Sequence, residues 1–314
     1  MRRSLLLVAN PAANLALLLV WAAILPSLAC AQSKTADQAA PPGWKLTWSD
    51  EFNGTSIDHS KWAFETGNGE NGWGNNELEY YTDRPENAYV ADGALHIRAV
   101  KESFNGFDYT SAKLLSRGLF SQKYGRFEFR AKLPTGAGLW PALWMMPQGD
   151  VYGSWPTSGE IDITEARGQQ PDRVLGTIHY GNRWPRNQHS GETYILPHGQ
   201  NIADFHVYTL EWEPGVIRWY VDDHLYETQR RWFSAKEDGG RNPWPAPFDQ
   251  PFFIIMNVAV GGNFLSGPDD TTKFPQEMVV DYVRAYEKVG GYGPTPPPQP
   301  AATQASATQP AAPQ

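Results

Sequence analysis

The segment Arg126–Leu133, RFEFRAKL, alternates apolar and polar side chains with a period of two residues. In an extended chain Phe127, Phe129, Ala131 and Leu133 point to one face, and the charged residues between them point to the other. This alternation is typical of a β-strand with one buried face and one face in water. We therefore predict a strand here, with its charged side in solvent.

Two further segments predict strands by other signals. The apolar runs Val216–Val221 and Leu225–Thr228 are separated by the turn cluster DDH at 222–224, which predicts a β-hairpin. Pro251–Val260, PFFIIMNVAV, is continuously apolar, as expected for a strand covered on both sides. Glycine (29) and proline (26) punctuate the whole chain, and only short stretches fit a helical period. These features predict an all-β protein, a β-jelly roll sandwich of two antiparallel sheets.

Composition limits the partners. The chain has 314 residues, and one large all-β domain is the simplest organisation at this length. A formal net charge of −8 provides no basic face for nucleic acid or anionic lipid, and it disfavours sulfated polymers. Thirteen tryptophans favour a neutral ligand held by stacking. We expect a monomer with no nucleic-acid partner.

The N-terminus has the features of an export signal. Arg2 and Arg3 precede the apolar run Leu15–Leu25, and small residues follow it up to Ala31. We predict that residues 1–31 are a signal peptide cleaved after Ala31, and that the mature protein is secreted or periplasmic. An uncleaved anchor is the alternative, but too few uninterrupted apolar residues are present to span roughly 30 Å.

Cys30 is the only cysteine, so an intrachain disulfide and a cysteine-rich metal site are both excluded. A lipid on Cys30, which would attach the protein to a membrane, is the minority alternative. Bacterial lipoprotein signals typically have Leu three positions before the cysteine. In this chain Ser27 occupies that position. We therefore expect cleavage without lipidation.

Three segments follow the signal peptide. Residues 32–41 are small and polar, which predicts a short flexible N-terminal segment. Residues 42–290 contain the strand signals and are predicted to form one folded domain. Residues 291–314 are mostly Pro, Ala, Gln, Thr and Ser in low complexity, and they cannot bury enough apolar surface to fold. We predict that they form a disordered tail.

The segment GEIDITEARG, which begins at Gly159, places three acids at short spacing. In a regular strand Glu160 and Asp162 share one face, whereas Glu165 points to the other. A β-bulge that absorbs one of the two residues between Asp162 and Glu165 returns Glu165 to the face of Glu160. With this bulge, all three acids line one surface.

Three acids on one surface are costly, because like charges repel and raise the pKa values of their neighbours. Retaining glycoside hydrolysis nevertheless requires two carboxyl groups about 5–5.5 Å apart, one as nucleophile and one as acid/base. Glu160 and Glu165 are candidates for these two roles, and Asp162 between them can hold Glu160 by a hydrogen bond. Solvated acids on an exposed strand are the alternative that spacing alone leaves open.

Segments spread over the whole predicted domain match one known family in order. They are WSDEF (Trp48–Phe52), GWGNNELEYYT (Gly72–Thr82), YGRFEFRAKLP (Tyr124–Pro134), GLWPALWMMP (Gly138–Pro147), GEIDITE (Gly159–Glu165), GTIHY (Gly176–Tyr180), MNVAVGGNF (Met256–Phe264) and VDYVRAY (Val280–Tyr286). Together they resemble glycoside hydrolase family 16, specifically its laminarinase branch of endo-β-1,3-glucanases. The resemblance implies a β-jelly roll with a long open substrate cleft.

The resemblance also implies roles and a substrate. It assigns nucleophile, helper and acid/base to Glu160, Asp162 and Glu165. Two residues, Ile163 and Thr164, separate Asp162 from Glu165, as in β-1,3-glucanases, whereas lichenases typically have one. The expected activity is therefore that of a secreted, retaining endo-hydrolase that cuts β-1,3 linkages in laminarin-type β-glucan by double displacement.

Aromatic and polar residues in the matching segments are candidates for substrate binding. Trp140 and Trp144 are four apart, so in a strand they face the same side and can stack on sugar rings. Core packing is the alternative, and the resemblance favours the cleft. The remaining candidates, each of which could instead be structural, are Asn76, Arg117, His179, Trp184 and Asn257.

Glu51, the Gly93 carbonyl and Asp281 match positions at which bacterial relatives often hold a structural calcium ion away from the cleft. Hard oxygen ligands of this type suit calcium. We expect no cofactor for catalysis.

Three other functions remain open at this point. The same fold serves as a non-catalytic β-glucan-binding protein, although such relatives typically lack the catalytic glutamates. Transglycosylation is compatible with a retaining mechanism. Mixed-linkage β-1,3-1,4-glucan, agar or carrageenan would be cut by the same acids between different cleft walls.

Overall fold

The computed structural model describes residues 40–300. The predicted signal peptide and the last fourteen residues of the predicted tail, 301–314, lie outside the described residues. Within residues 40–300, no helix is long and apolar enough to cross a membrane.

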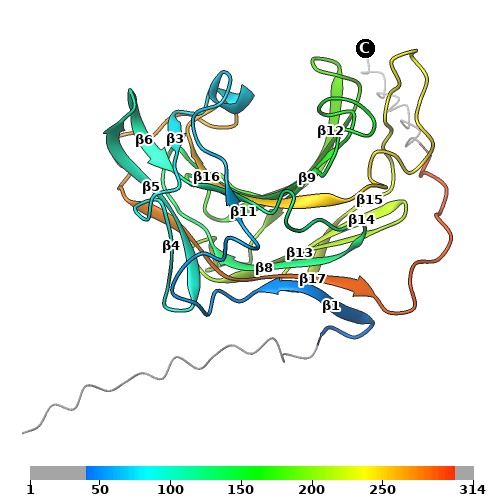
Figure 1. Cartoon of the computed structure of the whole chain (residues 1–314), viewed down its shortest axis with the longest axis horizontal. Helices are drawn as coiled ribbons and strands as arrows, with labels where there is room; N and C mark the ends of the chain where they lie inside the picture. Colours follow the sequence, from blue (N-terminus) through cyan, green and yellow to red (C-terminus); the bar gives the residue numbers. More distant parts are fainter. Residues whose placement is uncertain (1–39, 301–314) are drawn as a thin grey trace, which may run out of the picture. The chain divides into compact units, whose positions relative to one another are not determined.

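The described residues form a β-jelly roll of two packed sheets (Figure 1). The ten-stranded sheet runs β15 (His224–Gln229), β14 (Val216–Val221), β13 (His206–Glu213), β8 (Gly125–Lys132), β17 (Gln276–Lys288), β5 (Ala94–Phe104), β6 (Phe107–Ser111), β3 (Glu79–Tyr81), with β1 (Trp44–Asp50) on β17 and β4 (Ala88–Ala91) on β5. The seven-stranded sheet runs β12 (Asn187–Ile195), β11 (Arg173–Gly181), β10 (Glu160–Glu165), β9 (Leu139–Pro147), β16 (Phe252–Val260), β7 (Lys113–Leu115), β2 (Ala63–Phe64). The predicted all-β sandwich is confirmed.

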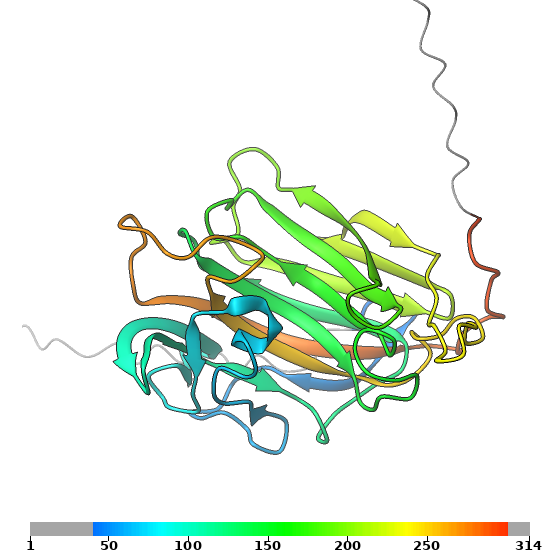
Figure 2. The ribbon, with the colours of Figure 1, turned by 90° about the horizontal axis from the view of Figure 1, so that it is seen from above.

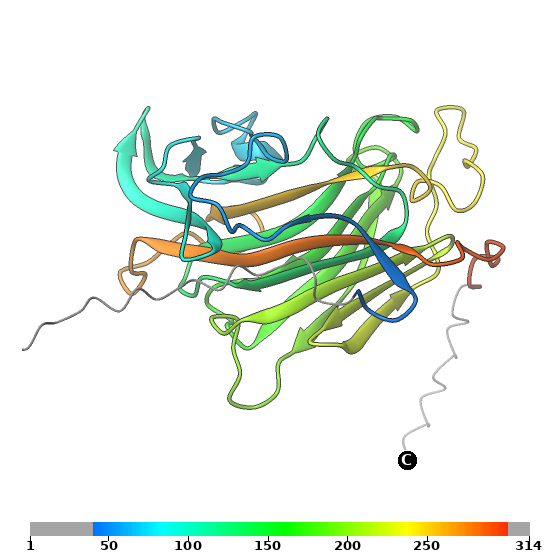
Figure 3. The same cartoon turned by 60° about the horizontal axis from the view of Figure 1, so that its bottom comes forward.

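All strand pairs named above are antiparallel except β3 with β6. The long strand β17 organises the ten-stranded sheet, because it pairs with β8 on one side and with β1 and β5 on the other (Figure 3). The short irregular helical segment η1 (Gly72–Asn76) lies outside the sheets. In Figure 1, η1 and β12 rise on opposite sides of the seven-stranded sheet.

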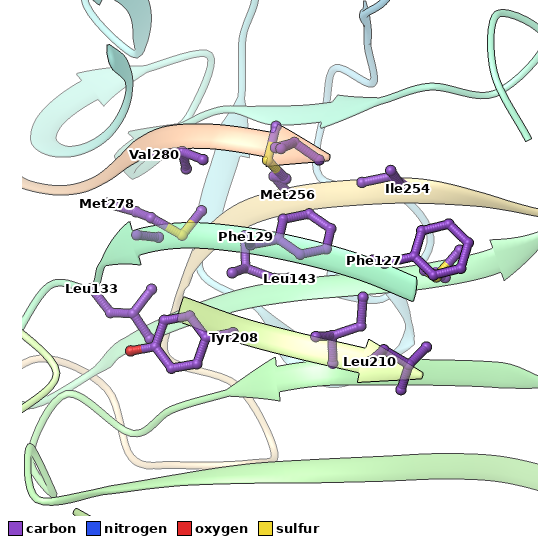
Figure 4. Packing of buried hydrophobic residues seen from close by; sticks show 14 of the residues in the cluster. Phe127, Phe129, Leu133, Leu143, Tyr208, Leu210, Ile254, Met256, Met278 and Val280 are labelled. Carbon is purple, nitrogen blue, oxygen red and sulfur yellow. The ribbon is translucent and has the colours of Figure 1, made fainter. Parts of the chain in front are cut away.

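Side chains from both sheets meet in one core (Figure 4). The ten-stranded sheet contributes Phe127, Phe129, Tyr208, Leu210, Met278 and Val280, and the seven-stranded sheet contributes Leu143, Ile254 and Met256. Phe127 and Phe129 are completely buried, and truncation of such a side chain to alanine typically costs about 3–5 kcal/mol. Because side chains alternate along a strand, this core leaves every second residue of β9, β10 and β11 on the outer face of the seven-stranded sheet.

The alternation predicted for β8 is correct on the apolar side and only partly correct on the polar side, where Arg130 and Lys132 are partly exposed but Glu128 is buried. Arg126 and Glu128 are only 8% and 6% exposed, although their side of the strand was expected in water. Arg126 Nε donates to Glu128 Oε1 at 2.6 Å, and the Tyr286 hydroxyl donates to Glu128 Oε2 at 3.1 Å. Arg126 Nη1 also donates to Glu211 on β13 at 2.9 Å. Long side chains from the neighbouring strands therefore cover this face and pair its charges.

The predicted hairpin and buried strand are both confirmed. β14 and β15 are joined by a two-residue turn in which Asp222 and Asp223 have φ values of 49° and 65°. Positive φ at both central residues matches the twist of a tight hairpin, and aspartate tolerates it. β16 is buried at all nine positions, since β9 and β7 flank it and side chains cover both of its faces.

The first residues of the predicted tail, 291–300, have no regular secondary structure and contact the domain at three places. The Tyr292 and Tyr124 rings lie 5.4 Å apart between centroids. Trp244 Nε1 donates to the Pro296 carbonyl at 2.8 Å, and the backbone N–H of Gln299 donates to a carbonyl 69 residues earlier at 2.9 Å. This part of the tail therefore lies along the domain.

Candidate active site

The pairing of β10 contains the predicted bulge. Asp162 is opposite Trp144 and Thr164 is opposite Leu143, so β10 has one residue more than β9 between these pairs. The register between β10 and β11 also shifts after Asp162 and resumes at Glu165. Glu165 returns by this shift to the outer face of the sheet, the face seen from above in Figure 2.

Aromatic side chains surround Glu160, the first of the three acids. The Trp155 indole N–H donates to a carboxylate oxygen of Glu160, and His179 is directly opposite Glu160 on β11. The Trp155 ring lies 6.0 Å from that of His179 and 6.4 Å from that of Trp184. Trp155 and Trp184 are 37% and 70% exposed, so both rings are accessible to a ligand. Trp184 thus lies next to Trp155, the residue that contacts Glu160.

Asp162 is 3% exposed, and its Oδ2 lies 3.3 Å from His179 Nε2. Burial raises the pKa of Asp162 well above its ordinary value, the charges of Glu160 and Glu165 add to this, and His179 opposes it. For His179, burial by itself lowers the pKa, but the three negative charges outweigh it and raise the pKa to about 10. His179 is therefore a cation at neutral pH, and it compensates part of the acidic charge.

Glu165 has the electrostatic environment of a proton donor. Burial raises its pKa to about 7, and the Glu160 charge adds to the rise. The His179 cation and a hydrogen bond from Trp140 Nε1 to Glu165 Oε1, 3.0 Å long, act in the opposite direction. A carboxyl group that still holds its proton near neutral pH can serve as a general acid.

One oxygen each from Glu160 and Asp162 and one ring nitrogen of His179 lie within 4.8 Å of one another. Two carboxylates and an imidazole are a donor set that a divalent metal can use. A metal ligand must be a neutral imidazole, however, and the raised pKa of His179 favours the cation. The arrangement therefore suits acid/base chemistry better than metal binding.

Trp140 and Trp144 lie on the same face of β9, as predicted, and each has a fixed orientation. Trp140 stacks on Phe264 with 4.8 Å between ring centroids. Trp144 Nε1 donates to Asn257 Oδ1 at 2.7 Å, and Asn257 Nδ2 donates to the Tyr81 hydroxyl at 3.0 Å. Both ends of the Asn257 amide are thus bound to protein. Of the two interpretations of Asn257, the structure favours the structural one, orientation of Trp144.

The structure places Asn76 and Arg117 away from the catalytic acids. Asn76 Nδ2 donates to Asn263 Oδ1 at 2.9 Å, which joins η1 to the loop that also carries Phe264. The Arg117 guanidinium lies 5.7 Å from the centre of the Phe253 ring on β16. Asn76 therefore borders the Trp140 side of the outer face, and Arg117 follows β7, which is three strands from β10.

The predicted calcium ligands lie in the ten-stranded sheet and its connections, and both carboxylates have arginine partners. Glu51 Oε1 and Oε2 accept from Arg284 at 2.8 and 2.7 Å. Asp281 Oδ2 accepts from Arg130 Nη1 at 2.7 Å. A cation at this place has to compete with two guanidinium groups for the same oxygens.

Three contacts at the site were missed from the sequence. Trp155 reaches Glu160, Phe264 supports Trp140, and Lys113 Nζ lies 5.3 Å from the centre of the Trp144 ring. For Trp155, the only sequence signal is an indole in the loop just before the acidic motif. Phe264 and Lys113 lie far from their partners in sequence and carry no such signal.

Comparisons with known proteins all indicate the same family. The model of glycosyl hydrolases family 16 matches residues 63–284. The chain is 48% identical to glucan endo-1,3-beta-glucosidase A1 of Niallia circulans, over 81% of this chain and 39% of that protein, so it spans less than half of that relative. It is 47% identical to a beta-glucanase of Rhodothermus marinus, over 79% of this chain and 87% of the relative. The laminarinase catalytic domain from Thermotoga maritima superposes with a TM-score of 0.68 at 45% identity, covering 77% of this chain and 98% of that domain.

The hydrogen bond from Trp140 predicts a measurable shift in the pKa of Glu165. Trp140→Phe removes the indole N–H that stabilises the ionised carboxylate, so the pKa of Glu165 should rise from about 7 by roughly half a unit to one unit. The measurement is a 13C NMR titration of the side-chain carboxyl carbon. In the control Trp144→Phe, which removes a donor to Asn257 instead, the pKa should stay in place. Equal shifts in the two variants would contradict the assignment.

Proposed function

The chain belongs to family 16 of the glycosyl hydrolases, and on that premise we propose that it is an endo-acting β-1,3-glucanase for laminarin-type β-glucan. The names of the Niallia circulans and Thermotoga maritima relatives support this substrate. The observation that carries the proposal is the bulge in β10, which places Glu160, Asp162 and Glu165 on one face. The raised pKa of Glu165 then gives that residue a role distinct from that of Glu160.

The proposed mechanism is double displacement with retention. Glu160 attacks the anomeric carbon, while Glu165 protonates the oxygen of the leaving sugar and the glycosidic bond breaks. Water then attacks the glycosyl-enzyme, with Glu165 removing its proton, and Glu160 leaves. The Trp155 indole holds one carboxylate oxygen of Glu160 in place during both steps.

We assign glucan binding to the indole rings around these acids, of which Trp155 and Trp184 are exposed and Trp140 and Trp144 are partly buried. Trp140 and Trp144 lie on the side of β9, and Trp155 and Trp184 lie on the side of β11 and β12. Sugar rings stack on such faces, because their axial C–H groups are apolar and the π-systems are negative. A glucan chain lying across β10 therefore meets an aromatic surface on either side of Glu160.

Mixed-linkage β-1,3-1,4-glucan and other polysaccharides of the family are the alternative substrates, and transglycosylation is the alternative outcome. A purely glucan-binding role is a weaker proposal, because all three acids are present and the pKa of Glu165 is adjusted for proton transfer. We also propose that the enzyme acts outside the cytoplasm, on the strength of the export signal predicted in residues 1–31.

The substrate proposal predicts a ranking of polymers. The full chain should release reducing ends from laminarin faster than from lichenan, agarose or carrageenan, because the two-residue gap before Glu165 is that of β-1,3-specific relatives. Initial rates at equal mass concentration provide the comparison. A catalytically dead Glu160→Gln variant controls for background release. Faster cleavage of agarose or carrageenan would overturn the substrate assignment.

The division of labour between the glutamates predicts two different azide products. Glu165→Ala should slow glucan hydrolysis by about 10²–10⁴-fold, because the general acid is lost, and should slow an activated aryl glucoside much less. Azide should then restore turnover as a β-glycosyl azide, since the intermediate on Glu160 still forms. With Glu160→Ala, azide attacks directly and should give the α anomer. NMR identification of the same anomer from both variants would show that the roles are wrongly assigned.

We propose a structural calcium ion near Glu51, Gly93 and Asp281, supported by their oxygen chemistry and by the family resemblance. The ion binds only the folded state, so EDTA should lower the melting temperature and added calcium should restore it. Asp281→Asn should abolish the response to EDTA. A melting temperature that is indifferent to both reagents would leave the pairs with Arg284 and Arg130 as the stabilising interactions here.

A further inference from the structure

A pocket that the proposed hydrolysis does not use lies at the β12 edge of the seven-stranded sheet. Its volume is about 720 Å³, within the range of about 300–1,000 Å³ typical of ligand sites. It is formed by the beginning of β12, the end of β15, the loop that follows β15, and residues 298–300 of the tail. None of Glu160, Asp162 and Glu165 lines it.

The pocket is strongly cationic. Arg230, Arg231 and Arg241 line it, and no aspartate or glutamate is found among the described residues of its wall. None of these arginines takes part in an ion pair between described residues. Two acids of the same loop have other partners, since Glu237 pairs with Arg183 and Asp238 accepts from a backbone N–H of its own turn. In a chain with a net charge of −8, such a cluster is a local exception.

The remaining wall has the groups that a sugar requires. Amide and hydroxyl groups come from Gln188, Ser190 and Gln299. Phe233 provides partly exposed apolar surface, whereas Trp232 is only 4% exposed and stacks on Trp244 with 4.6 Å between centroids. Hydroxyl-binding groups together with an aromatic wall are typical of saccharide sites, whereas free guanidinium groups bind planar or tetrahedral oxyanions through paired N–H donors.

The pocket is connected to the active site through paired strands. His189 lines the pocket and is directly opposite His179 in the β11–β12 ladder. Their ring centroids are 5.7 Å apart. A saccharide that occupies the face of His179 therefore has the arginine pocket as its neighbour beyond β12.

We propose that this pocket binds an acidic sugar residue, a uronate or a sulfate ester, at a site separate from the catalytic carboxylates. The arginines hold the oxyanion, the amides and hydroxyls hold the ring hydroxyls, and Phe233 contacts the apolar face of the ring. A polysaccharide with acidic residues among neutral ones is the class of ligand that fits. The site requires no cleavage, so it stands independently of the proposed hydrolysis.

Calorimetric titration of the full chain tests this site. The probes are a glucuronate trisaccharide, a sulfated glucose trisaccharide, the neutral glucose trisaccharide and sodium sulfate, all at equal ionic strength. At least one acidic trisaccharide should bind about tenfold or more tightly than the neutral one, and the tighter of the two identifies the oxyanion. An acidic sugar that binds no more tightly than the neutral one would overturn the proposal. So would displacement by sodium sulfate at the same concentration, which would show an adventitious ion only.

Variants locate the binding. Arg231→Ala and Arg241→Ala should each weaken the acidic trisaccharide by about tenfold, because a hydrogen-bonded charge is lost, and Arg231→Glu should abolish its binding. The control Lys101→Ala removes one positive charge on β5, outside the pocket. All the changed side chains are exposed or partly exposed, so melting temperatures should match that of the native chain. Unchanged affinity in the arginine variants, or equal loss in the control, would place the ligand elsewhere.

Discussion

The active site depends on one constraint: the charged carboxylate of Glu165 cannot be buried in the apolar core. Ile161 and Ile163 both enter the core from β10, so a regular period of two would send Glu165 after them. A glutamate among these apolar side chains would lose its solvation without gaining a partner, which costs several kcal/mol. The bulge removes the conflict, because it keeps both isoleucines inside and turns Glu165 to the outer face. Catalytic geometry and core packing are therefore satisfied by the same backbone irregularity.

Three acids on one face repel one another when all are ionised, so compensating groups and unequal protonation are needed. His179 provides the compensating cation next to Asp162, and the indoles of Trp155 and Trp140 donate to Glu160 and Glu165. An N–H donor stabilises an ionised carboxylate, so the bond from Trp140 limits how far burial can raise the pKa of Glu165. In Glu165, burial still prevails and the pKa remains raised, to about 7. A general acid that ionises near its working pH is the arrangement that proton transfer favours.

Patterns within single segments predicted the sandwich, the hairpin at Asp222 and the bulge, because these features depend on neighbouring residues. Contacts between distant segments were not predictable in this way. Glu128 was expected in water, yet Tyr286 covers it from 158 residues away. Asn257 was considered as a sugar ligand, yet its amide bonds to Trp144 and to Tyr81, which is 176 residues away. In such cases the sequence shows which residues share a strand face. Which distant side chains bury that face depends on tertiary packing.

Two kinds of positive charge lie near one another at the β11–β12 edge, and they serve different partners. His179 is partly buried, 3.3 Å from Asp162, so its charge acts directly on the acids and is little screened. Arg230, Arg231 and Arg241 are exposed, and at physiological ionic strength their field is screened beyond about 8 Å. Exposed guanidinium groups therefore contribute little to the pKa values of the catalytic residues. Their clustering in a pocket without carboxylates is explained better by an anionic group that arrives from solution than by the needs of the catalytic acids.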